Sequence, residues 1–427
     1  MKNKFSILSI ILTLGFIISA CGNGDNNTEA DDSNEDKSVT LKVIMEQVPD
    51  ADIVESMLSD FYEEHSNIEL DIETLPFDQM REKIIASSLS PDPVYDIIVV
   101  DNPWMYDFAS EGHLEPLNEM IEQEGDDYNY DDFAPPLKEI AEVDNEIYAI
   151  PFYNYALALT YRKDLFDDVN LEPPTSTDEL EEAAEELTDD DMSGIAMQPE
   201  RGYKIFEEWA NWLFAEDGEI IDDSGEVALD SPEARKALEK YIDTFEESAP
   251  DDSMNWGFDE AQRSITSGES AMMISYNWML PTVNDPAESG EDLAGEFDIA
   301  EVPGEKSVLG AWFWAIPSNS NNKDESWEFI SWVTHPDQDL DRVLQGGAPT
   351  RMDVMDKAGE EDEGQGEDYY EIVKSSLENS EPIADGPNAE EAVQEVGKEL
   401  SEAISGNKSV DEAVTDAAKE LEKTMEE

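Results

Sequence analysis

Short apolar runs alternate with amphipathic stretches along the first part of the chain. VTLKVIM at 39–45 predicts a β-strand, and residues 52–65 repeat apolar positions at helical spacing. YDIIVVD at 95–101 is a β-branched apolar run, which is typical of a buried parallel strand. Strands that alternate with helices in this way predict a layered α/β architecture with parallel strands.

Later segments read mainly as helices. STDELEEAAEEL at 176–187 and SPEARKALEKYIDTFEE at 231–247 each begin with a hydroxyl cap and acidic residues, as helix starts do. Beyond residue 320 helices dominate, and 389–404 carries a long amphipathic stripe. The acidic, glycine-bearing stretch 357–368 predicts a surface loop.

The charge balance changes which partners are expected. The 427 residues, which suggest two domains, include 106 acidic and 25 basic side chains, for a formal charge of −81. Such a chain repels nucleic acid and anionic membrane surfaces. We interpret the acidity as adaptation to a saline medium, because at ~1 M salt the Debye length falls to about 3 Å.

The N-terminus has the pattern of a secretory signal. Lys2 and Lys4 precede an apolar run, and Cys21 follows the small residues Ser19 and Ala20. IISAC resembles a bacterial lipobox, so we predict a signal peptide at 1–20, lipidation of Cys21 and a flexible polar tether at 21–38. The alternative is an ordinary signal peptide with an incidental free cysteine. Lipidation would hold the protein at the outer face of the cytoplasmic membrane.

Catalytic and metal-binding patterns are missing from the sequence. There is no G-x-S-x-G, P-loop, G-x-G-x-x-G or H-E-x-x-H motif, and the three histidines have no ligand spacing. With one cysteine, no intrachain disulfide or thiolate metal site can form. Pairs of carboxylates are unavoidable among so many acids and carry no information. We therefore expect no enzyme, metal or cofactor.

Aromatic side chains gather where predicted strands end. In open α/β sheets ligands bind outside the carboxyl ends of strands, and a sugar ring stacks its C–H face on an aromatic ring while its hydroxyls need directional partners. Asp101 and Arg351 could supply those partners. The alternative is that each ring is core, and we assign Trp327 and Trp332 to packing. The strand-end aromatics are Trp104, Tyr153, Tyr155, Tyr276, Trp278, Trp312 and Trp314.

From Leu41 almost to the end, the order of motifs resembles the family-1 extracellular solute-binding proteins of ABC importers, and within them the trehalose/maltose-type binders. The resemblance rests on YDIIVVDNPWMYDFASEGHLEPL, EIYAIPFYNYALALTYRKDLF, SGESAMMISYNWMLPTVNDP, LGAWFWAIPSNS, SWEFISWVTHPDQ and GGAPTR. It implies a two-lobed, type II periplasmic-binding-protein fold with hinge crossings and C-terminal helices. The implied lobes are 39–150 with 307–348, and 151–306 with 349–427.

The resemblance also implies roles for single residues. Asp101 matches a carboxylate that accepts sugar hydroxyls, Tyr153 and Tyr276 match stacking aromatics, and Trp312 and Arg351 match residues of two conserved turns. An acidic residue at Asp50 or Asp52 should contribute, Asn211 stands where relatives often carry a ligand-binding Glu, and Tyr155 stands where an Asp is common. Further candidates are Trp104, Asn154 and Trp278.

The expected function is capture of a small neutral carbohydrate, a di- or oligosaccharide, between the lobes and its delivery to ABC permease subunits. The expected protein is a lipid-anchored monomer that binds no nucleic acid. One alternative is the same fold tuned to a polyamine or peptide, and another is a surface glycoside hydrolase.

Overall fold

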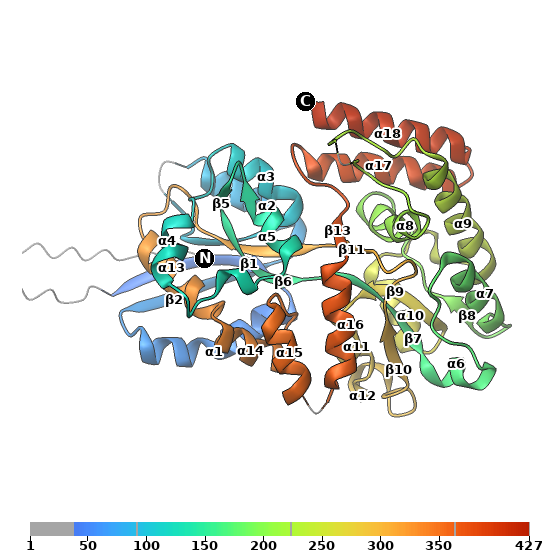
Figure 1. Cartoon of the computed structure of the whole chain (residues 1–427), viewed down its shortest axis with the longest axis horizontal. Coiled ribbons are helices and arrows are strands. Elements are labelled where there is room, and N and C mark those ends of the chain that lie inside the picture. Colours follow the sequence, from blue (N-terminus) through green and yellow to red (C-terminus); the bar gives the residue numbers. More distant parts are fainter. Residues whose placement is uncertain (1–37, 91–92, 223, 363, 427) are drawn as a thin grey trace, which may run out of the picture. The chain divides into compact units, whose positions relative to one another are not determined.

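The computed structural model describes residues 38–90, 93–222, 224–362 and 364–426. The predicted signal peptide, Cys21 and nearly all of the predicted tether lie outside these residues. Within the described part, two large sheets lie apart from each other, each flanked by its own helices (Figure 1). We call the sheet that contains β1 the first sheet and its surroundings the first lobe, and the other sheet and its surroundings the second.

The first sheet has the strand order β2-β1-β3-β12-β6. β1 runs parallel to β2 and β3, as predicted, while β12 is antiparallel to both of its neighbours. All residues of β3, β6 and β12 are buried, as is typical of central strands covered on both faces. The strands are β1 (Val39–Glu46), β2 (Ile68–Leu75), β3 (Ile97–Asp101), β6 (Ala149–Asn154) and β12 (Ala311–Ala315).

The second sheet has the order β10-β7-β9-β8. β7 is antiparallel to both neighbours, and β8 pairs parallel with β9. Its strands are β7 (Leu157–Arg162), β8 (Ser193–Ile195), β9 (Ser270–Tyr276) and β10 (Phe297–Ala300). Two smaller pairs are β4 (Glu142–Val143) with β5 (Glu146–Ile147), and β11 (Ser307–Leu309) with β13 (Ser380–Pro382).

Helices cover both sheets (Figure 1). The predicted starts hold: Ser176 and Ser231 cap α7 and α9 by accepting from the amides of Glu179 and Ala234. The first lobe contains α1 (Pro49–Glu64), α2 (Phe77–Ser88), α3 (Asn102–Ser110), α4 (Asn118–Glu124), η1 (Tyr130–Asp132), α5 (Pro135–Ala141), α13 (Lys323–Val333) and α14 (Pro336–Leu344). The second contains α6 (Lys163–Val169), α7 (Thr177–Leu187), α8 (Tyr203–Ala215), α9 (Pro232–Ser248), η2 (Ser253–Asn255), α10 (Phe258–Thr266), α11 (Met279–Val283), α12 (Pro286–Ser289), α17 (Ala389–Ile404) and α18 (Val410–Glu426).

The stretch 357–368 is not the predicted loop. α15 (Met352–Glu361) and α16 (Gly366–Glu378) occupy most of it and pack against each other. Gly359 lets α16 approach closely, because a Cβ there would stand 3.3 Å from the Cα of Glu367. Ala358 is buried in the core, and such packing favours a helix here although the acidic composition predicted a loop.

The lobe boundaries also differ from the predicted ones. β6 keeps residues up to Asn154 in the first sheet, so the chain leaves that sheet after 154 and not after 150. α15 packs against α14 of the first lobe, although it follows residue 349. β11 pairs with β13 outside the first sheet, so the return crossing enters that sheet at Ala311.

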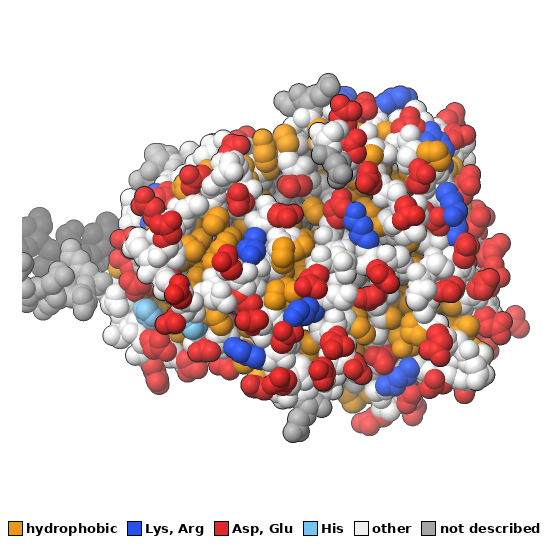
Figure 2. Space-filling model, viewed as in Figure 1, with side chains coloured by type: hydrophobic (Ala, Val, Ile, Leu, Met, Phe, Trp, Pro, Cys, Tyr) orange, Lys and Arg blue, Asp and Glu red, His pale blue; other side chains and the backbone are white. Residues whose placement is uncertain are grey.

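Acidic side chains are spread over the face of the molecule seen in Figure 2 and outnumber the basic ones there. None of the described helices is long and apolar enough to cross a membrane. The interior holds two apolar clusters, centred on the first and second sheets.

Candidate functional site

The first sheet places three of the predicted site residues in one row. Trp312 of β12 pairs with Asp101 of β3 on one side and with Tyr153 of β6 on the other. Directly paired residues project to the same face of a sheet, so the carboxylate and both rings lie side by side. All three side chains are buried.

Asp101 ends β3 and caps α3. Its Oδ1 accepts from the amide of Asn102 at 3.0 Å and from the hydroxyl of Tyr155 at 3.0 Å. Burial, and next the nearby charge of Glu46, raise the pKa of Asp101 well above its usual range. The charged form of Asp101 is therefore disfavoured in this site unless a further hydrogen-bond donor reaches its carboxylate.

Beside Asp101 the rings form an apolar wall. Tyr153 stacks near Trp312 with ring centroids 6.0 Å apart and planes 23° apart, and Trp104 meets Trp312 edge-on at 5.4 Å. The Tyr153 hydroxyl donates to Glu46 Oε2 at 3.0 Å. Burial, partly opposed by this hydrogen bond, raises the pKa of the Glu46 carboxyl.

The second lobe adds a matching set of rings. Tyr276, the last residue of β9, meets Tyr155 edge-on at 5.3 Å, and Trp278 stacks on Tyr276 at 5.4 Å with 20° between planes. Phe258 lies 4.8 Å from Tyr276 on the same side. Tyr155 and Tyr276 thus connect the strand ends of the two sheets.

Lys204, in the first turn of α8, brings a positive charge to the same place. Its Nζ donates to Glu207 Oε2 at 2.7 Å and to the hydroxyl of Tyr276. Burial is the largest single effect and opposes the charged form of Lys204, but Glu207 and Tyr276 together outweigh it and raise the pKa of the ammonium above its usual value. Lys204 therefore stays protonated at neutral pH.

Together these side chains make up what we call the interlobe cluster. Its first-lobe members other than Glu46 and Tyr155 are buried, whereas Lys204, Tyr276 and Trp278 keep part of their surface exposed. Solvent therefore reaches part of the cluster in both lobes. Tyr203 belongs with these side chains, because Lys204 Nζ lies 5.3 Å from the centre of its ring. The members are Glu46, Asp101, Trp104, Tyr153, Tyr155, Tyr203, Lys204, Glu207, Tyr276, Trp278 and Trp312.

A second contact joins the lobes next to the cluster. Trp104 Nε1 donates to Glu390 Oε2 at 3.2 Å, and the amide of Asn388 donates to Asp107 Oδ1 at 3.1 Å. Trp104 and Asp107 lie on α3, while Asn388 caps α17 and Glu390 lies in its first turn. We call this pair of contacts the α3–α17 contact.

Asn154 and Asp50 lie near the cluster but have structural partners. Asn154 Oδ1 accepts from the amide of Ala156 and from Asn277 Nδ2, both at 3.1 Å, and its Nδ2 donates to the carbonyl of Pro349. These bonds hold the crossing between the sheets. Asp50 forms a buried ion pair with Arg342.

Arg351 and Asn211 are placed elsewhere, contrary to prediction. Arg351 is fully buried, donates to the carbonyls of Thr334 and Asn129 at 2.9 and 2.8 Å, and covers the Phe133 ring at 3.7 Å. It therefore packs the first lobe, because its Nε and Nη1 bond to backbone carbonyls there and its guanidinium covers an aromatic ring. Asn211 bonds to the turn before it and accepts from the amide of Val308 at 3.2 Å, which fastens α8 to β11.

The sequence reasoning missed Glu46, Tyr203, Lys204 and Glu207. Glu46 ends β1, so the same strand-end rule that found Asp101 could have found it. Lys204 and Glu207 share one helix face at a three-residue spacing, and a lysine is conspicuous in a chain with few basic residues.

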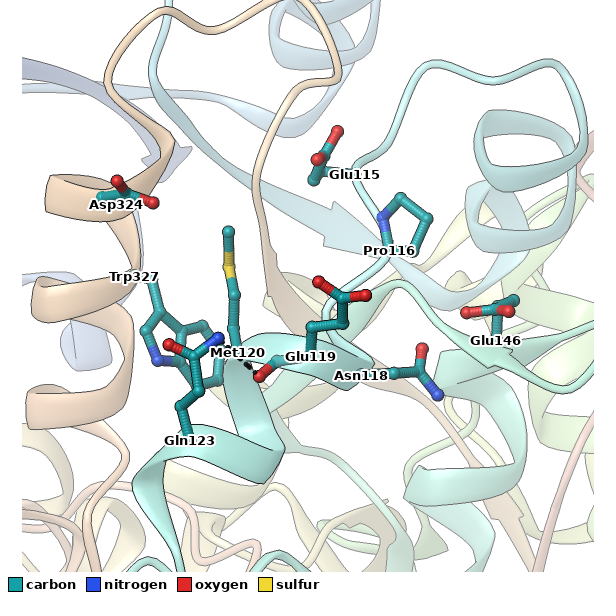
Figure 3. Close-up of a pocket in the computed structure, with 9 residues that line it drawn as sticks. All are labelled: Glu115, Pro116, Asn118, Glu119, Met120, Gln123, Glu146, Asp324 and Trp327. Carbon is teal, nitrogen blue, oxygen red and sulfur yellow. Dashed lines mark hydrogen bonds between the residues drawn. The ribbon is translucent and has the colours of Figure 1, made fainter.

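A separate hollow lies on the first lobe. Figure 3 shows this pocket of about 560 Å³, with Trp327 of α13 facing Met120 of α4 and several carboxylates at its rim. It contains no member of the interlobe cluster. No group of His, Cys, Asp and Glu among the described residues is arranged to hold a metal ion.

The chain is similar in sequence to known bacterial binding proteins. Residues 42–339 match the family described as bacterial extracellular solute-binding protein. The mannitol-binding protein of Pseudomonas aeruginosa is 28% identical over 291 residues, which cover 64% of each chain, so the match spans less than two thirds of that relative.

Solved structures extend the likeness to nearly the whole chain. An ABC transporter solute-binding protein of Agrobacterium radiobacter, in complex with ribitol, has a TM-score of 0.79 at 24% identity and covers 91% of this chain and 99% of its own. One of Thermotoga lettingae, bound with α-D-tagatose, also has a TM-score of 0.79, at 25% identity, and covers 90% and 99%. These likenesses confirm the predicted two-lobed α/β fold.

Proposed function

Because the chain belongs to the bacterial extracellular solute-binding protein family, we propose that it captures a small neutral carbohydrate, a sugar or polyol, between its lobes for an ABC importer. The observation that carries the proposal is the interlobe cluster, where rings and hydrogen-bonding groups from both sheets converge. The relatives named for mannitol, ribitol and tagatose support this ligand class.

Each part of the cluster suits one part of such a ligand. The faces of Trp312, Tyr153 and Tyr276 can cover the C–H surface of a sugar. The carboxylates of Asp101 and Glu46 can accept hydrogen bonds from ligand hydroxyls, and such charge-assisted bonds are stronger where water is excluded. No step of this scheme changes a covalent bond, so the protein acts as a receptor.

Closure of the lobes would complete the site. The chain passes between the lobes after Asn154, again before Ala311, and a third time between α15 and α17, and a hinge can act at these crossings. Hinge closure around ligands is established for periplasmic binding proteins. The ligand favours closure to the extent that it binds the closed form better than the open one. The closed form would then dock on the permease subunits and release its ligand there.

Lipidation of Cys21 would keep the receptor beside its permease. The proposal rests on the sequence IISAC after an apolar run, which lies outside the described residues. Expression in a bacterial host with labelled palmitate should give a labelled, membrane-bound protein, whereas Cys21→Ala should be unlabelled. Label that persists in the Cys21→Ala variant would rule out this site.

Isothermal titration calorimetry tests the ligand class. The protein would be titrated in high salt with D-mannitol, ribitol, D-tagatose, maltose and trehalose, and in parallel with putrescine. We expect saturable binding of at least one sugar or polyol, weakened at least about fivefold in Trp312→Ala, since a stacked ring contributes about 1 kcal/mol or more. Trp327→Ala, far from the cluster, is the control.

The alternatives give different results in the same samples. The cluster carries more carboxylates than ammonium groups, which favours a cationic solute as the second candidate. Binding of putrescine without any sugar would establish that candidate. Release of sugar from oligosaccharides by the purified protein would instead establish a glycoside hydrolase.

A further inference from the structure

One oxygen in the interlobe cluster has no partner. Glu207 is 2% exposed, and its Oε1 is buried without a hydrogen-bond donor among the described residues. Buried carboxylate oxygens are nearly always hydrogen-bonded, because an unsatisfied one loses its hydration without compensation. Glu207 Oε1 is thus an acceptor that awaits a donor.

A donor group stands beside this acceptor. Lys204 Nζ contacts the other Glu207 oxygen at 2.7 Å and the hydroxyl of Tyr276. An ammonium has three N–H donors, so one remains after these two bonds. The pair therefore offers an acceptor and a donor next to each other, and together the two groups carry no net charge.

The pair faces the aromatic part of the cluster. Tyr276, which Lys204 contacts, stacks on Trp278 and meets Tyr155. The charge of Glu207 also contributes, after burial, Asp101 and Tyr203, to the raised pKa of the Tyr155 hydroxyl. Glu207 and Lys204 thus lie where the rings of both lobes come together.

We infer that Lys204 and Glu207 determine specificity by binding two neighbouring hydroxyls of the ligand. One hydroxyl donates to Glu207 Oε1, and the adjacent one accepts from Lys204 Nζ. A neutral vicinal diol matches this neutral pair, whereas a ligand without one of the hydroxyls leaves a buried group unpaired. The inference rests on the proposed function and adds that the protein recognises two neighbouring hydroxyls of the ligand.

Glu207→Gln and Glu208→Gln form a matched pair of variants. Both are isosteric changes at adjacent positions of α8, but Glu208 points into the second lobe, where its Oε2 accepts from the amide of Gln198 and the hydroxyl of Tyr241, both at 2.7 Å. Whichever of D-mannitol, ribitol, D-tagatose, maltose and trehalose binds the wild type most tightly is the probe, together with its monodeoxy forms. Circular dichroism checks folding, and Lys204→Gln repeats the test if Glu207→Gln does not fold.

We expect Glu207→Gln to weaken binding of the probe roughly ten- to hundredfold, the range for a hydrogen bond to a charged group, and Glu208→Gln to leave it unchanged. One monodeoxy form of the probe should bind the wild type with a similarly reduced affinity. Its affinity should fall little further in Glu207→Gln, because removing the hydroxyl and replacing the carboxylate abolish the same hydrogen bond. Equal affinity of wild type and Glu207→Gln, or losses that add, would overturn the inference while sugar binding stands. A wild type that binds no sugar or polyol would overturn the proposed function itself.

Discussion

At residue scale, Gly310 leaves no room for a side chain beside the site. A Cβ at this position would stand 1.5 Å from Cε2 of Tyr155. Gly310→Ala should displace that ring, break its bond to Asp101, and lower the free energy of unfolding by about 1–3 kcal/mol, the usual cost of overpacking. Urea unfolding would measure the loss of stability, and calorimetric titration with the sugar or polyol that binds the wild type would measure the effect of the displaced ring on affinity.

Tyr155→Phe separates displacement of the ring from loss of the hydrogen bond to Asp101, because it removes the hydroxyl and keeps the ring. We expect it to weaken sugar binding less than Gly310→Ala and to retain most of the stability. If Gly310→Ala has the stability and affinity of the wild type, the close approach of Tyr155 to residue 310 is wrong.

Glu208 should make the stability depend on pH. Burial raises its pKa to about 8, above the ordinary value of 4.5. Between these values the unfolded chain releases the proton and the folded chain keeps it, so the free energy of unfolding falls as pH rises. Glu208→Gln keeps both hydrogen bonds without an ionisable group. Above pH 8 its free energy of unfolding should therefore exceed that of the wild type by up to about 5 kcal/mol.

Urea unfolding at pH 4.5, 6 and 8.5 measures this difference. The variant and the wild type should agree at the lowest pH and diverge as pH rises. Parallel stability profiles would show that Glu208 is already ionised in the folded protein.

The place of a single residue in the candidate site was predictable where the residue ends a strand, but not where long-range packing determines its contacts. Asp101 and Tyr153 follow from the rule that ligands lie at the carboxyl ends of strands, whereas Trp312 lies near the beginning of the antiparallel β12 and only the sheet register brings it beside them. Arg351 was assigned to the site from a motif, but its Nε and Nη1 bond to backbone carbonyls of Thr334 and Asn129, which are distant in the sequence. No local pattern announces such long-range partners.

At the scale of elements, the α3–α17 contact holds the lobes together. Glu390→Ala removes the acceptor of Trp104 and should shift the protein toward open forms, which lowers apparent affinity about three- to tenfold. Glu391→Ala, an exposed neighbour on the same helix, is the control. Small-angle X-ray scattering without ligand should show a larger radius of gyration for Glu390→Ala. Identical scattering and affinity would show that the contact does not influence closure.

Elements with strong periodicity were predictable, and those defined by contacts were not. Helix starts with a hydroxyl cap, such as those of α7 and α9, follow from local chemistry. The start of α16 and the end of α15 do not, since acidic residues and glycines favour a loop until the two helices pack on each other.

At the scale of the whole molecule, the acidic surface should make stability depend on salt. With 106 acidic and 25 basic residues, most carboxylates have no basic partner to pair with. Their mutual repulsion is screened as ionic strength rises. We expect the melting temperature to increase by at least about 5 °C between 0.1 M and ~2 M NaCl, a shift of a few kcal/mol for a protein of this size.

Sucrose at matched osmolality is the control, because it stabilises without screening charge. A melting temperature that does not change with NaCl would contradict adaptation to a saline medium. The two-lobed fold itself was predictable from the order of motifs, but the exact crossings depend on strand pairing over long distances, which periodicity does not encode.

The position of β12 has a consequence for synthesis. It lies between β3 and β6, yet it follows every strand of the second sheet in the sequence. A nascent chain that has emerged as far as Ala300 can pair β7 to β10, while the first sheet still lacks its middle strand. The sheet begun first is thus finished only after residue 315 has left the ribosome or the export channel, and until then its open edges are exposed to chaperones and proteases.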